Sequence, residues 1–291
     1  MAHAAPATTN TGVSRGLLPA TRWLLIAFCG LTALGLGSLY VLAGTTDRTF
    51  AWTIQPPLTA AFLGAGYGAG FVLSALALRD GIWVRARLPV YTVLVFVLLT
   101  LVPTLIHLDR FHFAPEFDAL GPLAKGAAWF WLAIYVGLPL LMVPVVVAQE
   151  RAVGVDPPRR RPVPLGLRVA LAVESAVLVV VGVVLFVAPT AAEILWPWPL
   201  TPLTARAVAA WLVAFGGTAA VAAFGDLERL RSGTIAFTAL GSLVLLAVAR
   251  FPGTVDWSRP AAWVFVATAA AAVATGAAGW RAASAATGRL P

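Results

Sequence analysis

Pro57-Leu58-Thr59-Ala60 recurs as Pro202-Leu203-Thr204-Ala205, at an offset of 145 residues (202 − 57). Two further matches follow in the same order: Arg110-Phe111 with Arg250-Phe251 at an offset of 140, and Ala127-Ala128-Trp129 with Ala261-Ala262-Trp263 at an offset of 134. The offset shrinks by a few residues along the chain, as short deletions in a duplicated unit would produce. The sequence therefore predicts two copies of one structural unit.

The composition indicates that the solvent is a lipid bilayer. Hydrophobic residues make up 60% of the chain, charged residues only 11%, and the mean hydropathy is +0.89, whereas a soluble domain carries about 25% charged residues. Eight apolar stretches are long enough to cross about 30 Å of hydrocarbon, which takes about 20 helical residues. They are Arg22–Ala43, Pro57–Leu78, Leu88–Leu108, Ala127–Val147, Leu167–Val187, Pro202–Phe224, Ser232–Ala249 and Pro260–Trp280. We therefore expect an all-α polytopic membrane protein with eight transmembrane helices.

The eight stretches divide four and four about a polar, proline-containing loop. The predicted parts are a disordered cytoplasmic tail over 1–21, a four-helix membrane repeat over 22–150, a basic Pro-rich cytoplasmic linker over 151–166, a second four-helix repeat over 167–281, and a cytoplasmic tail over 282–291. An even number of spans per repeat means that both copies insert the same way up. The two units should therefore be parallel and related by an axis along the membrane normal.

The basic residues predict the orientation. If the N-terminus is cytoplasmic, 14 of the 20 Lys and Arg residues fall on the inner side and six on the outer side. This positive-inside bias places both termini in the cytoplasm of a bacterial plasma membrane protein. The same residues at helix ends and near anionic headgroups account for the net charge of +8, so we expect no nucleic-acid partner. The lone Cys29, inside the first stretch, excludes an intrachain disulfide.

Polar side chains gather at the outer end of the third stretch. They are His107, Asp109, Arg110, His112, Glu116 and Asp118. Imidazoles and carboxylates can bind zinc and other transition metals, but the spacing His-x-Asp-x-x-His matches no recognised ligand pattern, and Arg110 would repel a cation. We therefore expect a polar cap with no metal and no cofactor, in which His107, Asp109, His112 and Glu116 are the weak catalytic candidates. Because the second copy keeps only the Arg-Phe step, we interpret Arg110 and Arg250 as structural.

Glu174 is the only acidic residue within a predicted span. An ionisable group at that depth is costly and needs a partner, and we predict Thr218 or Thr275 for this role because they lie at similar depth. A protonated carboxyl that hydrogen-bonds between helices is the favoured interpretation. The alternative is a proton-coupled transport role.

Four alternating glycines lie in the second span: Gly64, Gly66, Gly68 and Gly70. They do not form a nucleotide-binding loop, because no strand–turn–helix context surrounds them. Two small-xxx-small frames instead predict close approach of a neighbouring helix.

Each half shares a pattern: a Gly-containing first helix, a Trp/Pro loop leading into Pro-Leu-Thr-Ala, and a third helix ending in Arg-Phe. This pattern resembles the four-helix membrane unit of the DoxX-like group of small bacterial membrane proteins, here in tandem. The composition, with one Lys against nineteen Arg, resembles uncharacterised multi-pass membrane proteins of high-GC actinobacteria. The DoxX-like group has no single agreed catalytic set, so the resemblance implies no active-site residues.

Three classes of function are compatible with these features. A non-catalytic scaffold or accessory subunit is favoured, because most spans contain no strongly polar residue; its partners would be the lipid bilayer and other membrane subunits. The alternatives are a small-molecule transporter that uses Glu174, and a membrane enzyme that acts on a lipid or quinone at His107, Asp109 and His112.

Overall fold

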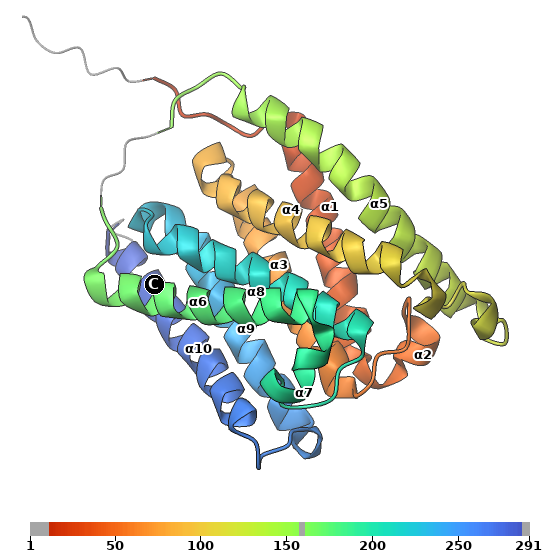
Figure 1. The fold of residues 1–291 in the computed structure, drawn as a ribbon. Helices are drawn as coiled ribbons and strands as arrows, with labels where there is room; N and C mark the ends of the chain where they lie inside the picture. The colour runs from red at the N-terminus through yellow and green to blue at the C-terminus, as the bar shows by residue number, and fades with distance from the viewer. Residues whose placement is uncertain (1–11, 157–160, 287–291) are drawn as a thin grey trace, which may run out of the picture.

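The computed structural model describes residues 12–156 and 161–286, in which the regular elements are helical (Figure 1). Eight helices are long and apolar enough to cross a membrane, which confirms the predicted all-α membrane class. They are α1 (Pro19–Leu36, continued by the π-helical turn η1, Gly37–Val41), α3 (Pro57–Asp80), α4 (Trp83–Ile106), α5 (Pro122–Glu150), α6 (Leu165–Val187), α8 (Pro202–Ala223), α9 (Leu227–Arg250) and α10 (Pro260–Ala286).

Proline and glycine set several helix boundaries. The helices α1, α3, α5, α8 and α10 begin with proline, whose missing N–H has no intrahelical partner in the first turn in any case. Gly81 ends α3 in the left-handed region at φ 69°, which a residue without a Cβ adopts at little cost. Short helices follow the first span of each half at matching places: η2 and α2 (Ala43–Thr45, Thr46–Thr49), and η5 and α7 (Pro189–Ala191, Ala192–Leu195).

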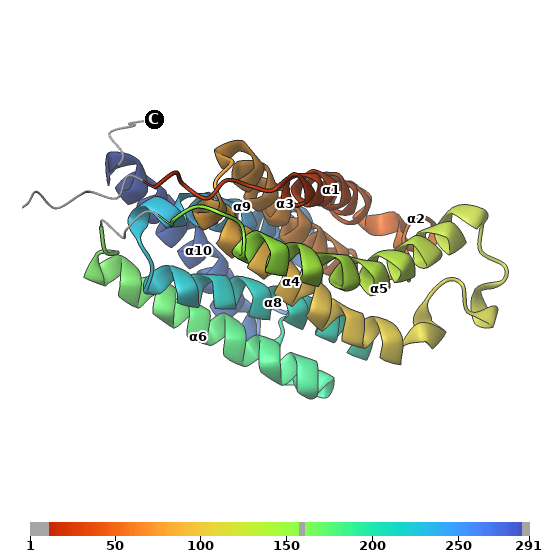
Figure 2. The same ribbon diagram turned by 90° about the horizontal axis from the view of Figure 1, so that it is seen from above.

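The second and third long helices of each half form the centre of the bundle. Across the halves, α3 packs against α9 and α4 packs against α8; within the halves, α1 packs on α3, α5 on α4, α6 on α8 and α10 on α9. Figures 1 and 2 show α5 and α10 on opposite flanks of this centre. A twofold axis between the halves would exchange α3 with α8 and α4 with α9. It would therefore exchange the α3–α9 contact with the α4–α8 contact. Both the duplication and the parallel superposition of the units stay predictions.

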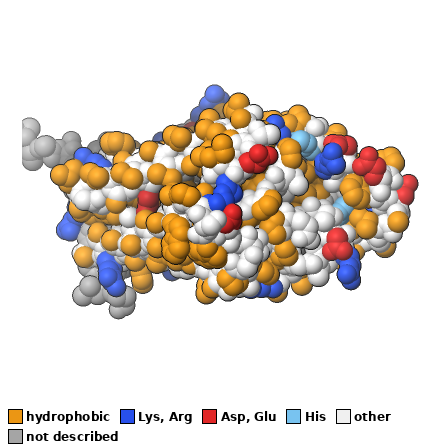
Figure 3. All heavy atoms as spheres, turned by 60° about the horizontal axis from the view of Figure 1, so that its bottom comes forward, with side chains coloured by type: hydrophobic (Ala, Val, Ile, Leu, Met, Phe, Trp, Pro, Cys, Tyr) orange, Lys and Arg blue, Asp and Glu red, His pale blue; other side chains and the backbone are white. Residues whose placement is uncertain are grey.

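The two ends of the bundle carry different connections. The segment before α1, the chain on either side of residues 157–160 and the end of α10 lie at one end, which we call the linker end (Figure 1). The opposite end, the loop end, holds α2, α7 and residues 107–121. Hydrophobic side chains are spread over the whole face in Figure 3, and charged side chains lie in small separate groups.

The chain termini differ from the predicted boundaries. Residues 12–18 are not a disordered tail: the Arg15 N–H donates to the carbonyl of Val155, and the Leu17 N–H donates to that of Gly81. The fully buried Gln149 of α5 also accepts from Leu18 N and donates to Gly16 O. Backbone groups of this segment are thus satisfied by neighbouring elements. Likewise α10 continues to Ala286, past the predicted end at 281; residues 1–11, 157–160 and 287–291 lie outside the described residues.

Candidate functional site

The predicted outer cluster is divided by its local contacts. His112 is fully buried, with Nδ1 2.8 Å from the Phe50 carbonyl and Nε2 3.0 Å from Thr53 Oγ1. Because a carbonyl can only accept, Nδ1 carries the proton, and Nε2 accepts from Thr53 in the neutral ring. Burial lowers the pKa of His112, which favours this neutral form. Both ring nitrogens are thus occupied, and neither is free to bind a metal.

His107 has a different partner. Its Nε2 lies 2.9 Å from Arg206 Nη1 of α8, so the ring accepts from the guanidinium. Burial, and then the positive charge of Arg206, lower the pKa of His107. Asp109 pairs with Arg110 at 3.0 Å, while Glu116 is exposed. Among the described residues, no three His, Cys, Asp or Glu side chains gather in a way that could hold a metal ion.

The two Arg-Phe steps have different contacts. Arg250 donates to the carbonyls of Tyr40 and Val41 at the end of η1, where a cation also interacts favourably with the helix dipole. Its contacts link α9 to the first half. Arg110 has its ion pair with Asp109 instead. The structural interpretation of the two arginines stays a prediction, for which only Arg250 provides a contact between the halves.

Glu174 faces the last helix of its own half. Its carboxyl oxygens lie 3.1 and 3.0 Å from Thr275 Oγ1 of α10, so one of the two predicted hydroxyl partners is confirmed. The other, Thr218, bonds to Thr92 of α4. The Thr275 hydroxyl has one hydrogen, which it can donate either to Glu174 or to the Ala271 carbonyl at 2.9 Å; when it donates to Ala271, its oxygen can accept a hydrogen bond from a protonated Glu174. No ion pair of Glu174 occurs within the described residues.

The glycines of α3 lie at close contacts with three other elements. A Cβ on Gly64 would lie 2.5 Å from Tyr40 N, one on Gly66 2.7 Å from the Trp211 ring, and one on Gly68 2.6 Å from Leu243 Cδ1. At Gly70 it would lie 3.4 Å from Thr32 Cγ2. At Gly64 the neighbouring atoms include backbone that cannot rotate away, whereas a Cβ at Gly66 or Gly68 would require the Trp211 or Leu243 side chain to shift.

A hollow that was not predicted from the sequence lies in the first half. It is a cavity of about 390 Å³, within the range of small-molecule sites, about 300–1,000 Å³. Most of its lining comes from α1 and α5, with α3, α4 and Trp211 of α8 behind them. Leu34, Leu123 and Phe130 line it and are largely exposed on the apolar surface, so it opens sideways between α1 and α5. We call it the α1–α5 cavity.

An aromatic wall bounds the α1–α5 cavity. The rings of Phe96 and Trp211 stack at 3.6 Å, and those of Trp131 and Tyr135 stack at 4.2 Å. The hydroxyls of Tyr67 and Tyr135 bond to each other at 2.5 Å. Tyr67 is ten residues into α3, about 15 Å along its axis, so this wall lies deep in the bundle.

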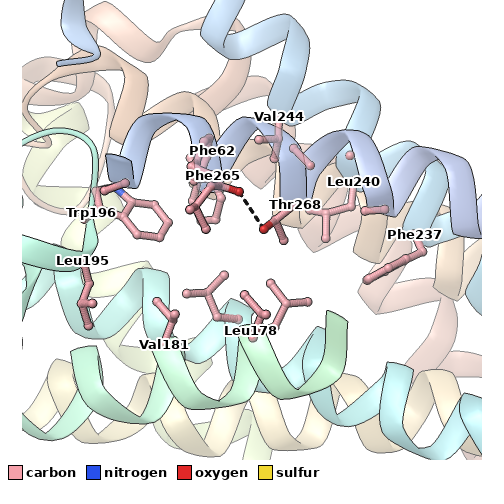
Figure 4. Close-up of a pocket in the computed structure, with 17 residues that line it drawn as sticks. Phe62, Leu178, Val181, Leu195, Trp196, Phe237, Leu240, Val244, Phe265 and Thr268 are labelled. Atoms are coloured by element: carbon pink, nitrogen blue, oxygen red, sulfur yellow. Dashed lines mark hydrogen bonds between the residues drawn. The ribbon is translucent and has the colours of Figure 1, made fainter. Parts of the chain in front are cut away.

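The second half has a smaller pocket at the matching place, between α6 and α10, with α8 and α9 behind (Figure 4). Its volume is about 90 Å³. Figure 4 shows Leu178 and Val181 facing Phe265 and Thr268 across the pocket, and the Thr268 hydroxyl donates to the carbonyl of Val264 in its own helix. Phe62 of α3 reaches into this pocket, as Trp211 of α8 reaches into the α1–α5 cavity.

Glycines explain why the second half is more closed. A Cβ on Gly241 of α9 would lie 2.5 Å from the Ala269 carbonyl of α10, and Cβ atoms on Gly276 and Gly279 of α10 would lie 2.4 and 2.5 Å from Thr238 and Thr234 of α9. At the repeat offsets, the first-half counterparts are Leu101 (241 − 140), Met142 (276 − 134) and Val145 (279 − 134). Larger side chains thus stand at all three positions in the first half, where α4 and α5 pack less extensively than α9 and α10 do.

The sequence contained a signal for this cavity. Span four carries Trp131 and Tyr135, where the second copy has Phe265 and Ala269 (131 + 134, 135 + 134), but sequence alone does not show which way these rings point.

Comparison with known proteins gives no match to a protein-family model, a curated protein or a solved structure. The DoxX-like resemblance therefore stays a prediction.

Proposed function

We propose that the protein is a non-catalytic protein of the bacterial plasma membrane that holds a lipophilic molecule in the α1–α5 cavity. As an accessory subunit or scaffold, it would present or retain this molecule for other membrane subunits. The observation that carries the proposal is a cavity of about 390 Å³ with an almost entirely apolar and aromatic lining, which opens between two helices that face the bilayer. A molecule dissolved in the membrane can enter it without crossing a polar surface.

The alternatives lack a site in this geometry. His107 and His112 are held by Arg206, Phe50 and Thr53, and neither lines the α1–α5 cavity. Glu174 is paired with Thr275 between α6 and α10, and it lines neither this cavity nor the pocket of Figure 4. An enzyme on the histidines or a transporter on Glu174 therefore has no specific observation in its favour.

Repeat-equivalent substitutions test the proposal. Ala127 lines the α1–α5 cavity, and Ala261, its counterpart at an offset of 134, lines the second-half pocket. In nanodiscs, an apolar diazirine probe should label the α1–α5 cavity residues of the wild-type protein saturably. Ala127→Trp should abolish saturable labelling there, and Ala261→Trp should preserve it.

The outcome that refutes the proposal is labelling that rises linearly with probe concentration at cavity residues, as at any lipid-facing surface. Equal effects of the two Trp variants would refute it as well, because the cavity would then have no special role.

The orientation belongs to the same proposal and has its own test. With Cys29 replaced by Ala, a cysteine at the exposed Ala119 should react with a membrane-impermeant maleimide on intact cells. A cysteine at Val153, which is 99% exposed at the linker end, should react only after lysis. The reverse pattern would place the termini outside.

A further inference from the structure

The polar groups of the α1–α5 cavity divide into satisfied and unsatisfied ones. Thr32, Ser38 and Thr49 line the cavity, and each hydroxyl donates to a carbonyl of its own helical segment. The Trp131 indole N–H donates to Thr104 Oγ1 at 3.0 Å. These four groups have their hydrogen bonds without a ligand.

One donor is left over at the cavity. The Tyr67 and Tyr135 hydroxyls bond to each other; because each carries one hydrogen and their mutual bond uses one, a second phenolic hydrogen is unused. Neither hydroxyl makes another hydrogen bond with the described residues, and a buried donor without an acceptor is unfavourable. The indole N–H of Trp211 also lacks an acceptor among the described residues, but it is fully covered and packs against Gly66 of α3, so it does not face the cavity.

The three side chains form one group at the back of the cavity. Tyr67 and Trp211 meet edge to face, with ring centroids 5.2 Å apart, and Tyr135 is joined to Tyr67 through the hydroxyls. All three line the cavity, whereas no Asp, Glu, Lys or Arg does. A charged headgroup at this depth would therefore be buried without a counter-ion, which is strongly unfavourable.

We propose that the ligand of the α1–α5 cavity is a neutral, lipid-soluble molecule that places an acceptor oxygen, such as a carbonyl, against Tyr67 and Tyr135. The unused phenolic hydrogen is the donor, and the apolar remainder of the ligand lies along Phe130 and Leu123 toward the opening. This inference rests on the proposed function and adds the chemistry of the ligand to it. In the second-half pocket the Thr268 hydroxyl is already bonded, and no tyrosine is among the residues that line it.

Two nearly isosteric probes test the inference: decanophenone, which has a carbonyl beside its phenyl ring, and decylbenzene, which has a methylene there. Binding of radiolabelled probes is measured on the full chain in nanodiscs, with empty nanodiscs subtracted. The wild-type protein should bind decanophenone about five- to tenfold more tightly, the ratio that one net hydrogen bond of about 1–1.4 kcal/mol gives. The double variant Tyr67→Phe/Tyr135→Phe should lower the ratio toward one while binding decylbenzene as before.

The failures of the two proposals are distinguishable. If wild-type protein binds both probes with equal affinity, or if the double variant keeps the full ratio, the acceptor-oxygen inference is overturned and the cavity proposal stands. If neither probe binds saturably, or if Ala127→Trp leaves their binding unchanged, the proposed function itself is overturned. Retained decylbenzene binding shows that the double variant is folded. The ratio of the two probe affinities in the wild-type protein tests the acceptor-oxygen inference without any variant.

Discussion

Gly64→Ala should destabilise the bundle because α3 and η1 touch at this residue. An added Cβ would lie 2.5 Å from Tyr40 N, 2.8 Å from Tyr40 Cβ and 2.9 Å from Tyr40 Cα. Two of these are backbone atoms and cannot rotate away. If Tyr40 moved away, two of its hydrogen bonds would be disturbed. Its hydroxyl donates to the Leu243 carbonyl at 2.8 Å, and its backbone carbonyl accepts from Arg250 at 2.6 Å.

The magnitude follows from two opposing terms. Overpacking of a close contact costs about 1–3 kcal/mol, and alanine in a helix gains about 0.5–1 kcal/mol over glycine. Gly137 of α5 is the matched control, because nothing lies within 4 Å of its added Cβ. Gly137→Ala should therefore be neutral or slightly stabilising. Because the alanine gain is common to both variants, they should differ by the overpacking term alone, roughly 1–3 kcal/mol.

The comparison is made by denaturant titration of both variants in one detergent, where refolding is checked first. A free energy of unfolding for Gly64→Ala that equals or exceeds that of Gly137→Ala would refute the close contact between α3 and η1. The helix arrangement around the α1–α5 cavity would then need revision, because α1 forms one side of it.

Three further predictions concern buried polar contacts. Glu174→Gln should keep the hydrogen bond to Thr275 and leave stability nearly unchanged, and Glu174→Leu should cost about 1 kcal/mol; equal losses in detergent unfolding would instead indicate an ionised, paired carboxylate. The pKa of His107 is lowered in the folded protein. Its contribution to the free energy of unfolding should therefore be complete above the pKa of the unfolded state, about 6.5, and should be lost as the pH falls through the pKa of the folded state. In scanning fluorimetry from pH 8 to 5, His107→Gln should therefore lose less Tm than wild type; parallel curves would contradict the contact with Arg206. Gln149→Leu removes bonds to Leu18 N, Thr21 Oγ1 and Gly16 O and should cost about 3 kcal/mol at about 1 kcal/mol each; a loss below 1 kcal/mol in the same titration would contradict the anchoring of residues 16–18 on α5.

The helices were predictable because their signals are local. Hydrophobic length and helix-starting prolines such as Pro57 and Pro202 located the spans, and similar depth identified Thr275 as a partner of Glu174. The burial of His112 was not predictable, because it depends on residues 107–121 folding back onto Phe50 and Thr53.

The cavity was less accessible to sequence analysis for a similar reason. Its lining comes from helices that are distant in the sequence, and their relative placement depends on side-chain contacts between them. The contrast between Gly241 and Leu101 is visible in the sequence, but it has meaning only once α9 is known to touch α10. Likewise, Trp211 belongs to the second half but lines a cavity of the first.

The central claim is that the α1–α5 cavity holds one lipophilic molecule, and native mass spectrometry of protein released from nanodiscs tests it most directly. The account predicts a wild-type adduct of one neutral molecule per chain, retained by Ala261→Trp and lost from Ala127→Trp. Wild-type protein with no specific adduct, or an adduct that Ala127→Trp retains in full, would contradict it.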